Sequence, residues 1–222
     1  MTSLAIYDMD RTITRTGTYS PFLIYAARRL APWRLIFLPI AVMAALAYVM
    51  KLINRGTLKE FNQRLMLGPI HPDRLKPLVA GFAQQTMDRN VYPQAIDRLA
   101  EDKAAGRRLV LATASYRLYA AGIAEKLGFD DIIATNSMIG LDTRILPKID
   151  GENCYGPAKL RMIEAWLVKE GIDRRDTHIR FYSDHASDAP VLEWADEAFA
   201  VNAHDRLLRL AKTRGWEVID WR

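Results

Sequence analysis

The sequence contains a single cysteine, Cys154, so no disulfide can form within the chain, and a reducing compartment is expected. Its N-terminal residues lack the basic stretch, long apolar core and small-residue cleavage site of a secretory signal, which favours a cytoplasmic location. Internal repeats and low-complexity tracts are missing as well. The four histidines show no metal-ligand spacing, and we expect ordinary surface or loop residues at His71, His178, His185 and His204.

Acidic residues are scarce between Gly17 and Tyr92. That segment holds three of them against ten lysines and arginines, whereas the net charge of the whole chain is only +5. The excess positive charge is therefore confined to one segment, which predicts an anionic partner for it. Nucleic acid is not the expected partner, because the basic residues flank apolar sequence and no recognition module is present.

From residue 93 onward, short apolar runs alternate with amphipathic stretches, as is typical of β-α units around a parallel sheet. The expected strands are Leu4–Tyr7, Arg108–Ala112, Ile132–Ala134, Ile179–Tyr182, Ala198–Val201 and Glu217–Ile219. The expected helices are Pro93–Ala105, Arg117–Leu127, Pro157–Glu170, Pro190–Trp194 and Asp205–Thr213. A β-hairpin is expected over Met138–Asp150, beside the sheet.

A helical insertion separates the first strand from the other β-α units. Ser20 and Pro21 indicate the start of a helix that Pro32 ends, and Thr57 with Glu60 predicts a capping box for a second helix. Between them lies the uncharged run 35–50, bracketed by basic residues. We therefore predict a core domain of residues 1–16 and 93–222 and a helical cap of residues 17–92.

Polar and acidic residues occur where the predicted strands end. Asp8, Asp10 and Thr12 follow the first strand, and Thr113 follows the second. Lys159 begins a predicted helix, and Asp184 and Asp188 follow another strand. Because ligand sites of open parallel sheets lie at the carboxyl ends of the strands, these residues are expected to converge.

This set of residues has the chemistry of phosphoryl transfer. Two carboxylates such as Asp8 and Asp184 tolerate proximity when Mg²⁺ lies between them. Asp8 can then attack phosphorus and form an aspartyl-phosphate, while Asp10 protonates the leaving alkoxide and activates water. Thr113 and Lys159 offer a hydroxyl and a positive charge to the phosphoryl oxygens. Taken singly, each motif also fits a turn, a helix cap or a solvated side chain.

In this order the motifs resemble those of the haloacid dehalogenase (HAD) superfamily, in its phosphoserine-phosphatase-like branch, subfamily IB. The resemblance implies a Rossmann-like three-layer α/β/α core with a mostly parallel sheet and an inserted helical cap of the C1 type. It implies Asp8 as nucleophile, Asp10 as general acid and base, and Thr113 and Lys159 as phosphate-binding residues. Mg²⁺ would be held by Asp8, the Asp10 main-chain carbonyl and Asp184, with Asp188 and Thr12 supporting. Arg11 stands where the family commonly has Gly or Ser.

The run 35–50 does not fit a single membrane crossing, because it is short of the roughly 20 apolar residues that a crossing needs. A crossing would also put Asp8 and Asp184 on opposite sides of the bilayer. Three alternatives remain: a buried cap core, an interfacial helix, or a re-entrant hairpin that turns near Pro39. The flanking basic residues, with Trp33 and Tyr48, favour contact with an anionic membrane surface, peripheral or re-entrant at the inner membrane.

The apolar, basic-flanked cap also resembles that of phosphatidylglycerophosphatases of type C, which implies a lipid phosphate such as phosphatidylglycerophosphate as the leading substrate. A soluble phosphomonoester such as phosphoserine is the main alternative. A hypothesis from a different class is a non-catalytic protein that binds membrane surfaces; it predicts a damaged motif, and all four motifs are intact.

Overall fold

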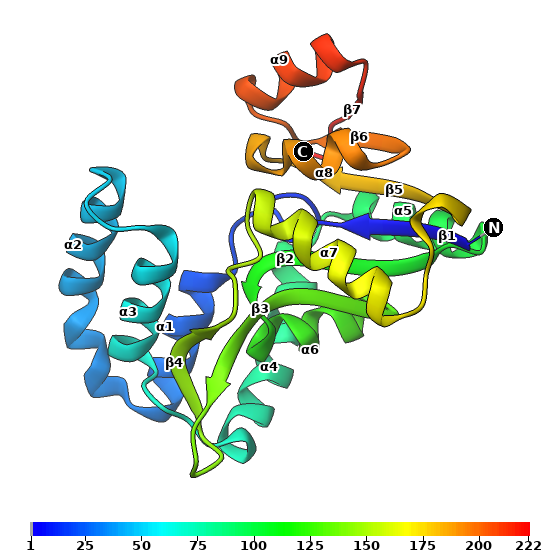
Figure 1. The fold of residues 1–222 in the computed structure, drawn as a ribbon. Helices are drawn as coiled ribbons and strands as arrows, with labels where there is room; N and C mark the ends of the chain where they lie inside the picture. Colours follow the sequence, from blue (N-terminus) through cyan, green and yellow to red (C-terminus); the bar gives the residue numbers. More distant parts are fainter. Residues whose placement is uncertain (1) are drawn as a thin grey trace.

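The computed structural model describes residues 2–222, and within them seven strands form one sheet (Figure 1). The strand order is β4-β3-β2-β1-β5-β6-β7. Every neighbouring pair is parallel except β3 and β4, which are antiparallel. The strands are β1 Thr2–Tyr7, β2 Arg108–Tyr116, β3 Asp131–Ile139, β4 Ile145–Asp150, β5 Thr177–Ser183, β6 Glu197–Val201 and β7 Glu217–Ile219.

Helices cover both faces of this sheet, which confirms the predicted three-layer α/β/α fold. One face packs against α5 and α6, and the other packs against α7, α8 and α9. The helices of these layers are α5 Pro93–Ala104, α6 Arg117–Leu127, α7 Pro157–Lys169, α8 Ala189–Trp194 and α9 Asp205–Arg214, with short 3₁₀ helices η2 Arg174–Asp176 and η3 Ala186–Asp188.

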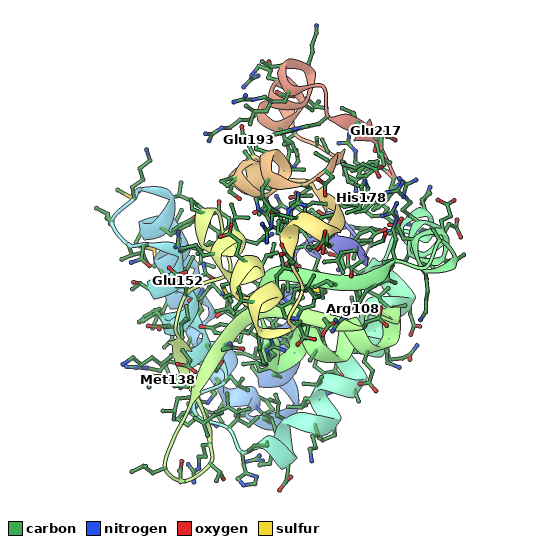
Figure 2. All side chains as sticks on the ribbon, turned by 45° about the vertical axis from the view of Figure 1, so that its right-hand side comes forward. Arg108, Met138, Glu152, His178, Glu193 and Glu217 are labelled. Carbon is green, nitrogen blue, oxygen red and sulfur yellow. The ribbon has the colours of Figure 1, made fainter. Side chains whose placement is uncertain are left out.

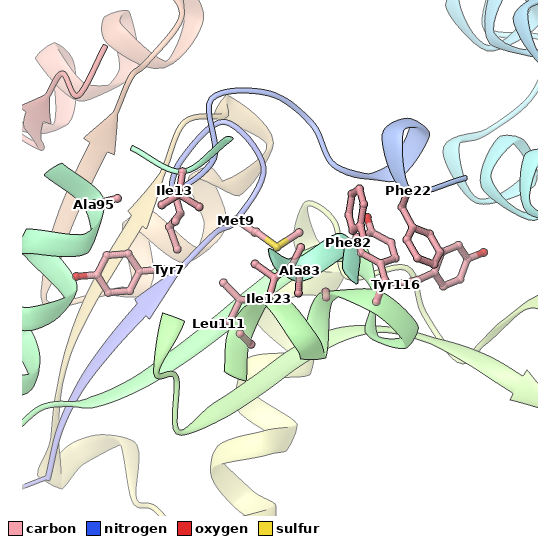
Figure 3. Packing of buried hydrophobic residues seen from close by; sticks show 14 of the residues in the cluster. Tyr7, Met9, Ile13, Phe22, Phe82, Ala83, Ala95, Leu111, Tyr116 and Ile123 are labelled. Atoms are coloured by element: carbon pink, nitrogen blue, oxygen red, sulfur yellow. The ribbon is translucent and has the colours of Figure 1, made fainter. Parts of the chain in front are cut away.

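Alternation along β1 explains why the sheet is buried on both faces. Leu4 and Ile6 belong to the apolar cluster under α7–α9, whereas Ala5 and Tyr7 belong to the cluster under α5 and α6. On the face covered by α5 and α6, the Tyr7 ring stacks on that of Tyr182, with ring centroids 4.1 Å apart. Figure 3 shows this cluster continuing from Tyr7 through Met9 toward the insertion. The first strand is therefore fixed at the centre of the core, and the residues that follow it start from a rigid position.

The insertion after β1 contains α1 Tyr19–Leu30, η1 Pro32–Phe37, α2 Leu38–Val49, α3 Arg55–Met66 and α4 Pro72–Asn90. The first three helices and η1 stand to one side of the sheet (Figure 1), whereas α4 packs along α6. Because of this, α4 shares its packing with the core. The division into a core of 1–16 and 93–222 and a cap of 17–92 stays a prediction.

An arm formed by β3 and β4 connects the core to the insertion. The backbone N–H of Ile149 in β4 donates to the Glu60 carboxylate of α3 (2.8 Å), and Ile70 pairs with Ile145. Met138 lies on this arm and Glu152 just beyond its end (Figure 2). The predicted hairpin over 138–150 forms, but its first strand begins at Asp131 and both strands belong to the sheet.

The predicted capping box at Thr57 and Glu60 is wrong. Asn54 caps α3 instead: its side chain accepts a hydrogen bond from the Thr57 backbone N–H (2.9 Å), and the helix starts at Arg55. With Asn54 as the N-cap, Glu60 lies three residues beyond the position that a capping box requires, and its carboxylate accepts from the Ile149 backbone of β4.

The uncharged run is neither a buried cap core nor a hairpin turning at Pro39. Pro39 lies in the first turn of α2, and the chain reverses only after Val49, where α3 returns alongside α2. Within residues 2–222, Pro32–Val49 is the one helical stretch long and apolar enough to cross a membrane by those two criteria, and none of it is buried. Of the three alternatives for this run, the interfacial helix remains compatible with the structure.

Candidate active site

The predicted site residues meet at the carboxyl ends of the central strands. β1 lies between β2 and β5, so the loops after these three strands converge, and α7 begins beside them. A cavity of about 550 Å³ opens here. The predicted residues that line it are Asp8, Asp10, Thr113, Lys159, Asp184 and Asp188.

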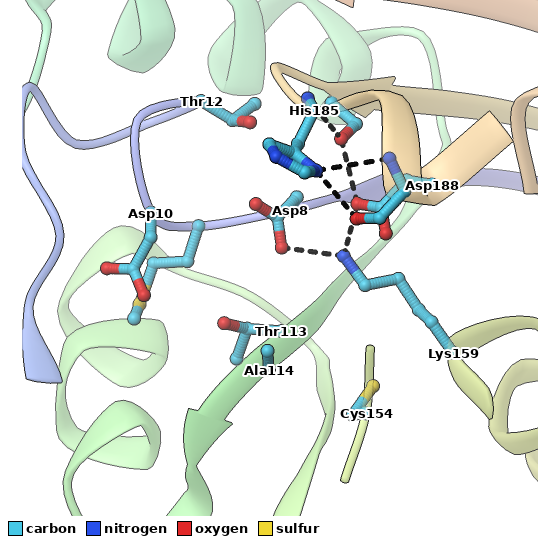
Figure 4. A network of polar contacts seen from close by, with 12 residues as sticks. Asp8, Asp10, Thr12, Thr113, Ala114, Cys154, Lys159, His185 and Asp188 are labelled. Carbon is cyan, nitrogen blue, oxygen red and sulfur yellow. Dashed lines mark hydrogen bonds and ion pairs between the residues drawn. The ribbon is translucent and has the colours of Figure 1, made fainter. Parts of the chain in front are cut away.

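Asp8 and Asp188 share the ammonium group of Lys159. Nζ donates to Oδ1 of Asp8 (2.7 Å) and to Oδ2 of Asp188 (2.5 Å), and all three side chains are buried (Figure 4). The hydroxyl of Ser183 donates to the same Asp188 oxygen (2.8 Å). Burial lowers the pKa of Lys159, but Asp188 and Asp8 outweigh it and the pKa is raised, so the lysine stays charged.

Asp10 lies on the other side of Asp8 from Lys159 (Figure 4). Its Oδ1 accepts from the backbone N–H and the hydroxyl of Thr18, each at 2.7 Å, and its Oδ2 accepts from the Ser115 hydroxyl (2.7 Å). Tyr119 in turn donates to the Ser115 oxygen (2.6 Å). The Asp10 carboxylate is thus held in one orientation at the cavity wall, as a group that exchanges protons with a substrate must be.

Thr12 does not face the cavity; it connects two loops of the site. Its buried hydroxyl accepts from the Asp184 backbone N–H (3.0 Å) and lies 3.4 Å from Oδ1 of the same residue. This contact fixes the loop after β5 relative to the loop after β1. The supporting role of Thr12 at a metal site stays a prediction.

Arg11 has a left-handed backbone with φ of 65°. Glycine adopts this region without a steric penalty, which gives a physical reason for a small residue here and makes Arg11 locally unfavourable. The Asn202 side chain holds the turn by donating to the carbonyl oxygens of Arg11 (3.1 Å) and Thr12 (3.2 Å). The exposed Arg11 side chain also lines the cavity mouth.

Thr113 lies inside β2 and not after it, because the strand runs on to Tyr116. The pairing of β2 with β3 shifts register between Thr113 and Tyr116, which turns this part of the strand out of the regular ladder. The Thr113 hydroxyl oxygen accepts from the Ser115 backbone N–H (3.1 Å), and the residue lines the cavity. The irregular strand end therefore presents both Thr113 and Ser115 to the site.

The acids of this site fit a divalent cation. Asp8, Asp184 and Asp188 are all buried, and Lys159 alone balances them, leaving two excess negative charges. The second oxygen of Asp188, Oδ1, is buried and has no hydrogen-bond partner within residues 2–222. Burial raises the pKa of Asp8 to about 6, and burial with repulsion from Asp8 raises that of Asp184 to about 7. These carboxylates would ionise more readily around a cation.

Residues 2–222 contain no ready-made cage of three His, Cys, Asp or Glu ligands. Lys159 lies between Asp8 and Asp188, and the Asp10 carboxylate is bonded to Thr18 and Ser115. Oδ2 of Asp8, Oδ1 of Asp188 and the carboxylate of Asp184 are not bonded to Lys159 and are thus available to an ion. A backbone carbonyl, as in the ligand set that the resemblance implies, would supplement them.

Two basic cap residues in the cavity were not identified from the sequence as site residues. Lys59 is buried, and its Nζ donates to the Ala114 carbonyl oxygen (2.6 Å) and to Oδ1 of Asn153 (2.7 Å). Burial, followed by repulsion from Arg55, lowers the pKa of Lys59 to about 7. Arg55 lies over the ring of Tyr155, 4.2 Å from its centroid, and both line the cavity. In the sequence, both basic residues were indistinguishable from the other basic residues that flank the apolar run.

His185 is an exposed loop residue, as predicted, and it also lines the cavity. Its Nδ1 accepts from the Ser187 backbone N–H (3.1 Å), which fixes the ring at the start of η3. Burial lowers its pKa, so the neutral ring is favoured. No spacing signal pointed to it because its neighbours in the site come from distant parts of the sequence.

Comparison with known proteins identifies the family. A relative named phosphoserine phosphatase SerB1, from Mycobacterium tuberculosis, is 33% identical over 120 residues, which are 53% of this chain and 37% of that protein. The chain spans 37% to 52% of the length of the first curated relatives it matches.

Solved structures share the whole fold. A protein of unknown function from Bordetella pertussis Tohama I is 26% identical, with a TM-score of 0.91 over 100% of both chains. A phosphoserine phosphatase, solved as a phospho-aspartyl intermediate analogue, is 18% identical with a TM-score of 0.64 over 100% of this chain and 94% of that one. The model of the haloacid dehalogenase-like hydrolase family matches residues 5–193. The chain belongs to the haloacid dehalogenase-like hydrolase family.

Proposed function

We propose that this protein is a Mg²⁺-dependent phosphatase that hydrolyses a phosphomonoester through an aspartyl-phosphate on Asp8. One observation carries the proposal. The Asp8 carboxylate lies at the cavity between the buried ammonium group of Lys159, which donates to its Oδ1, and the carboxylate of Asp10, which Ser115 and Thr18 hold in place. The relative named phosphoserine phosphatase and the family match support the same reaction class.

In the first half of the reaction, an Asp8 oxygen forms a bond to phosphorus as the bond from phosphorus to the ester oxygen breaks. Asp10 gives its proton to that departing oxygen, so the alcohol leaves neutral. In the second half, Asp10 takes a proton from water, and the water oxygen attacks the phosphorus of the aspartyl-phosphate. Inorganic phosphate is released and the Asp8 carboxylate is regenerated.

The surrounding residues stabilise charge on the phosphoryl oxygens. Lys159 Nζ already points at Asp8, so it is also within reach of a phosphoryl group bonded there, and Thr113 lies at the cavity wall to donate its hydroxyl. The ligands of Mg²⁺ would be Asp8, the Asp10 main-chain carbonyl and Asp184, with Asp188 supporting. Bound there, the ion supplies positive charge to the phosphoryl oxygens and relieves the repulsion between the acids.

For the substrate, we propose a lipid phosphate such as phosphatidylglycerophosphate. The cap contributes Ala45, Tyr48 and Leu58 to the cavity, together with the basic Arg55 and Lys59. Among the described residues, the acids that line the cavity are Asp8, Asp10, Asp184 and Asp188, all at the reaction centre. An apolar and basic wall suits an alcohol with a second anionic group and an acyl tail better than it suits an ammonium group.

A soluble phosphomonoester such as phosphoserine is the second candidate. The name of the mycobacterial relative favours it. A non-catalytic protein that binds membrane surfaces is the alternative from a different class, and it predicts no phosphate release from any compound.

Phosphate release from p-nitrophenyl phosphate with Mg²⁺ tests the reaction. We expect Asp8→Asn to lower kcat by about three orders of magnitude or more, because the nucleophile is lost. Asp142→Asn, the same substitution at an exposed turn, serves as the matched control and should keep full activity. Full activity of Asp8→Asn would refute the proposed nucleophile, and an inactive native protein would favour the non-catalytic alternative.

A substrate panel separates the two substrate classes. We expect the highest kcat/KM for phosphatidylglycerophosphate or phosphatidic acid presented in detergent micelles. A higher kcat/KM for phosphoserine would refute the lipid substrate while leaving the reaction chemistry intact.

A further inference from the structure

The solvent-facing side of η1 and α2 is apolar along its whole length. Ile36, Met43 and Val49 have exposed fractions of 68%, 63% and 73%. The exposed residues recur at helical spacing, three or four apart, so they form one continuous stripe. We call it the cap stripe; its members are Trp33, Ile36, Ile40, Val42, Met43, Leu46, Val49 and Met50.

A helix on the surface of a soluble protein normally has the opposite pattern, with its polar residues turned to water. Isolated exposed apolar residues are common, but a continuous apolar patch marks a surface that binds a protein or a membrane. In η1 and α2, no residue is buried. The packing of the cap therefore leaves this stripe without a partner inside the chain.

The charges around the cap stripe select between those two kinds of partner. No Asp or Glu occurs between Gly17 and Lys59. Arg28 and Arg29 end α1 just before the stripe, and Lys51 directly follows it; all three are exposed. An apolar stripe with cations at both ends and no acid complements a bilayer that carries anionic headgroups.

The geometry also decides how such a helix would lie. α2 alone has 12 residues, about 18 Å at the usual rise of 1.5 Å per residue, which is too short for a hydrocarbon core of about 30 Å, but η1 and α2 together form the 18-residue stretch Pro32–Val49, so the connections of this stretch decide the question. Both of its ends return to the same folded body, through α1 before it and α3 after it. The helix can lie in the plane of the interface without unfolding any part of the cap.

The opposite side of the same helix faces the active-site cavity. Ala45 and Tyr48 line the cavity next to Arg55 of α3, while Met43 and Leu46, their near neighbours in sequence, belong to the cap stripe. A surface that contacted the stripe would thus be separated from the cavity by the width of this one helix.

We propose that the cap stripe docks the protein on an anionic lipid bilayer, with α2 lying in the interface and the cavity on the opposite side of that helix. Docking on a bilayer requires no catalytic step, so a failure of the docking proposal and a failure of the proposed phosphatase reaction can be distinguished.

Vesicle flotation of the full chain tests the docking. We expect the native protein to float with vesicles that contain phosphatidylglycerol and to float less with vesicles of phosphatidylcholine alone. Added salt should weaken the binding, since exposed cations contribute to it. The double variant Ile36→Glu with Met43→Glu should partition at least about tenfold less, because two apolar anchors are lost and two repelling charges are added.

The matched control places the same two substitutions on exposed apolar residues of the core. Ile96 in α5 and Val168 in α7 are 45% and 81% exposed, and Ile96→Glu with Val168→Glu should float like the native protein. Thermal unfolding of both double variants checks that each is folded. Equal flotation of the stripe variant and the native protein would overturn the proposal.

A second copy of this chain is the competing occupant of the cap stripe. Sedimentation of the native protein in the absence of lipid distinguishes it. A dimer that Ile36→Glu with Met43→Glu dissociates, together with no flotation on phosphatidylglycerol vesicles, would overturn membrane docking in favour of self-association.

Discussion

At the scale of single residues, the site depends on how buried charges are compensated. Lys159 has two carboxylate partners, Asp8 and Asp188, at hydrogen-bond distance. Lys59, the other buried lysine of the cavity, has only neutral acceptors, of which the Ala114 carbonyl oxygen and Oδ1 of Asn153 are the nearest. A buried ammonium without an acid attracts an anion from outside, and the proposed phosphomonoester substrate is such an anion.

Lys59→Met should therefore weaken catalysis without unfolding the protein. We expect kcat/KM for p-nitrophenyl phosphate to fall about tenfold, which corresponds to the loss of one charge-assisted hydrogen bond. Nζ of Lys59 also donates to the carbonyl oxygen of Ala114, next to Thr113, so its loss would loosen this part of the site as well. Lys76→Met removes an exposed lysine of α4 and should leave kcat/KM unchanged. Steady-state kinetics measures both; an unchanged kcat/KM in Lys59→Met would show that the lysine has no part in the reaction.

At the scale of elements, the start of α7 places Lys159. Gly156, just before Pro157, has φ of 60° and ψ of −136°, a combination that essentially only glycine adopts. Its carbonyl oxygen accepts from the Lys159 backbone N–H (3.0 Å) and so fixes the first turn of the helix. The nearest atom to an added Cβ would be the Ser187 carbonyl oxygen at 3.7 Å, an ordinary contact, so the constraint lies in the backbone.

Gly156→Ala should lower both stability and activity. We expect a loss of about 1–3 kcal/mol in the free energy of unfolding, from backbone strain. A kcat about tenfold lower is also expected, because any shift of this turn moves Nζ of Lys159 away from Asp8. Gly151→Ala is the control: φ there is 72° and no atom lies within 4 Å of an added Cβ. Denaturant unfolding and kinetics should show a smaller stability loss and a normal kcat in the control.

The sequence predicted most elements because their signals are local. The strand at Glu217–Ile219 and the helix at Arg117–Leu127 have their predicted limits, since flanking turns and apolar periodicity set both. The extension of β2 through Thr113 depends on pairing with β3, and the hydrogen bond of Glu60 depends on β4. Such tertiary contacts leave no periodic signal in the sequence.

The same distinction holds for the site. Asp8, Asp184 and Lys159 were predictable because they follow strands or begin a helix in a fixed order. Ser115 holds Asp10 from the irregular end of β2, and Lys59 reaches the cavity from the cap. Neither has a neighbour in the sequence that would indicate its role.

At the scale of the whole molecule, the buried acids couple folding to protons. The pKa values of Asp8, about 6, and Asp184, about 7, lie above the value near 3.9 of an unfolded Asp. Between those limits the folded chain therefore binds more protons than the unfolded chain. The resulting stability is fully present below pH 4 and is lost as the pH rises through 6 and 7.

Without metal, the melting temperature should consequently fall between pH 5 and pH 7 by about 5 °C. Lys59, whose pKa is lowered to about 7, changes the stability mainly above pH 7, because the pKa of an unfolded lysine is near 10.4. Asp184→Asn cannot ionise at this position and should show a smaller fall. Calorimetry in matched buffers measures the difference; an equal fall in both proteins would contradict the assignment of the pH dependence to Asp184.

Mg²⁺ should reverse this loss, because a cation that binds only the folded chain stabilises it and competes with the protons on the same acids. At pH 7.5 we expect excess Mg²⁺ to raise the melting temperature by about 3 °C or more, and at pH 5 by less than about 1 °C, since Asp8 and Asp184 then hold their protons. Asp184→Asn should lose most of the shift at pH 7.5. An equal Mg²⁺ shift at both pH values, or an undiminished shift in Asp184→Asn, would place the ion elsewhere in the molecule.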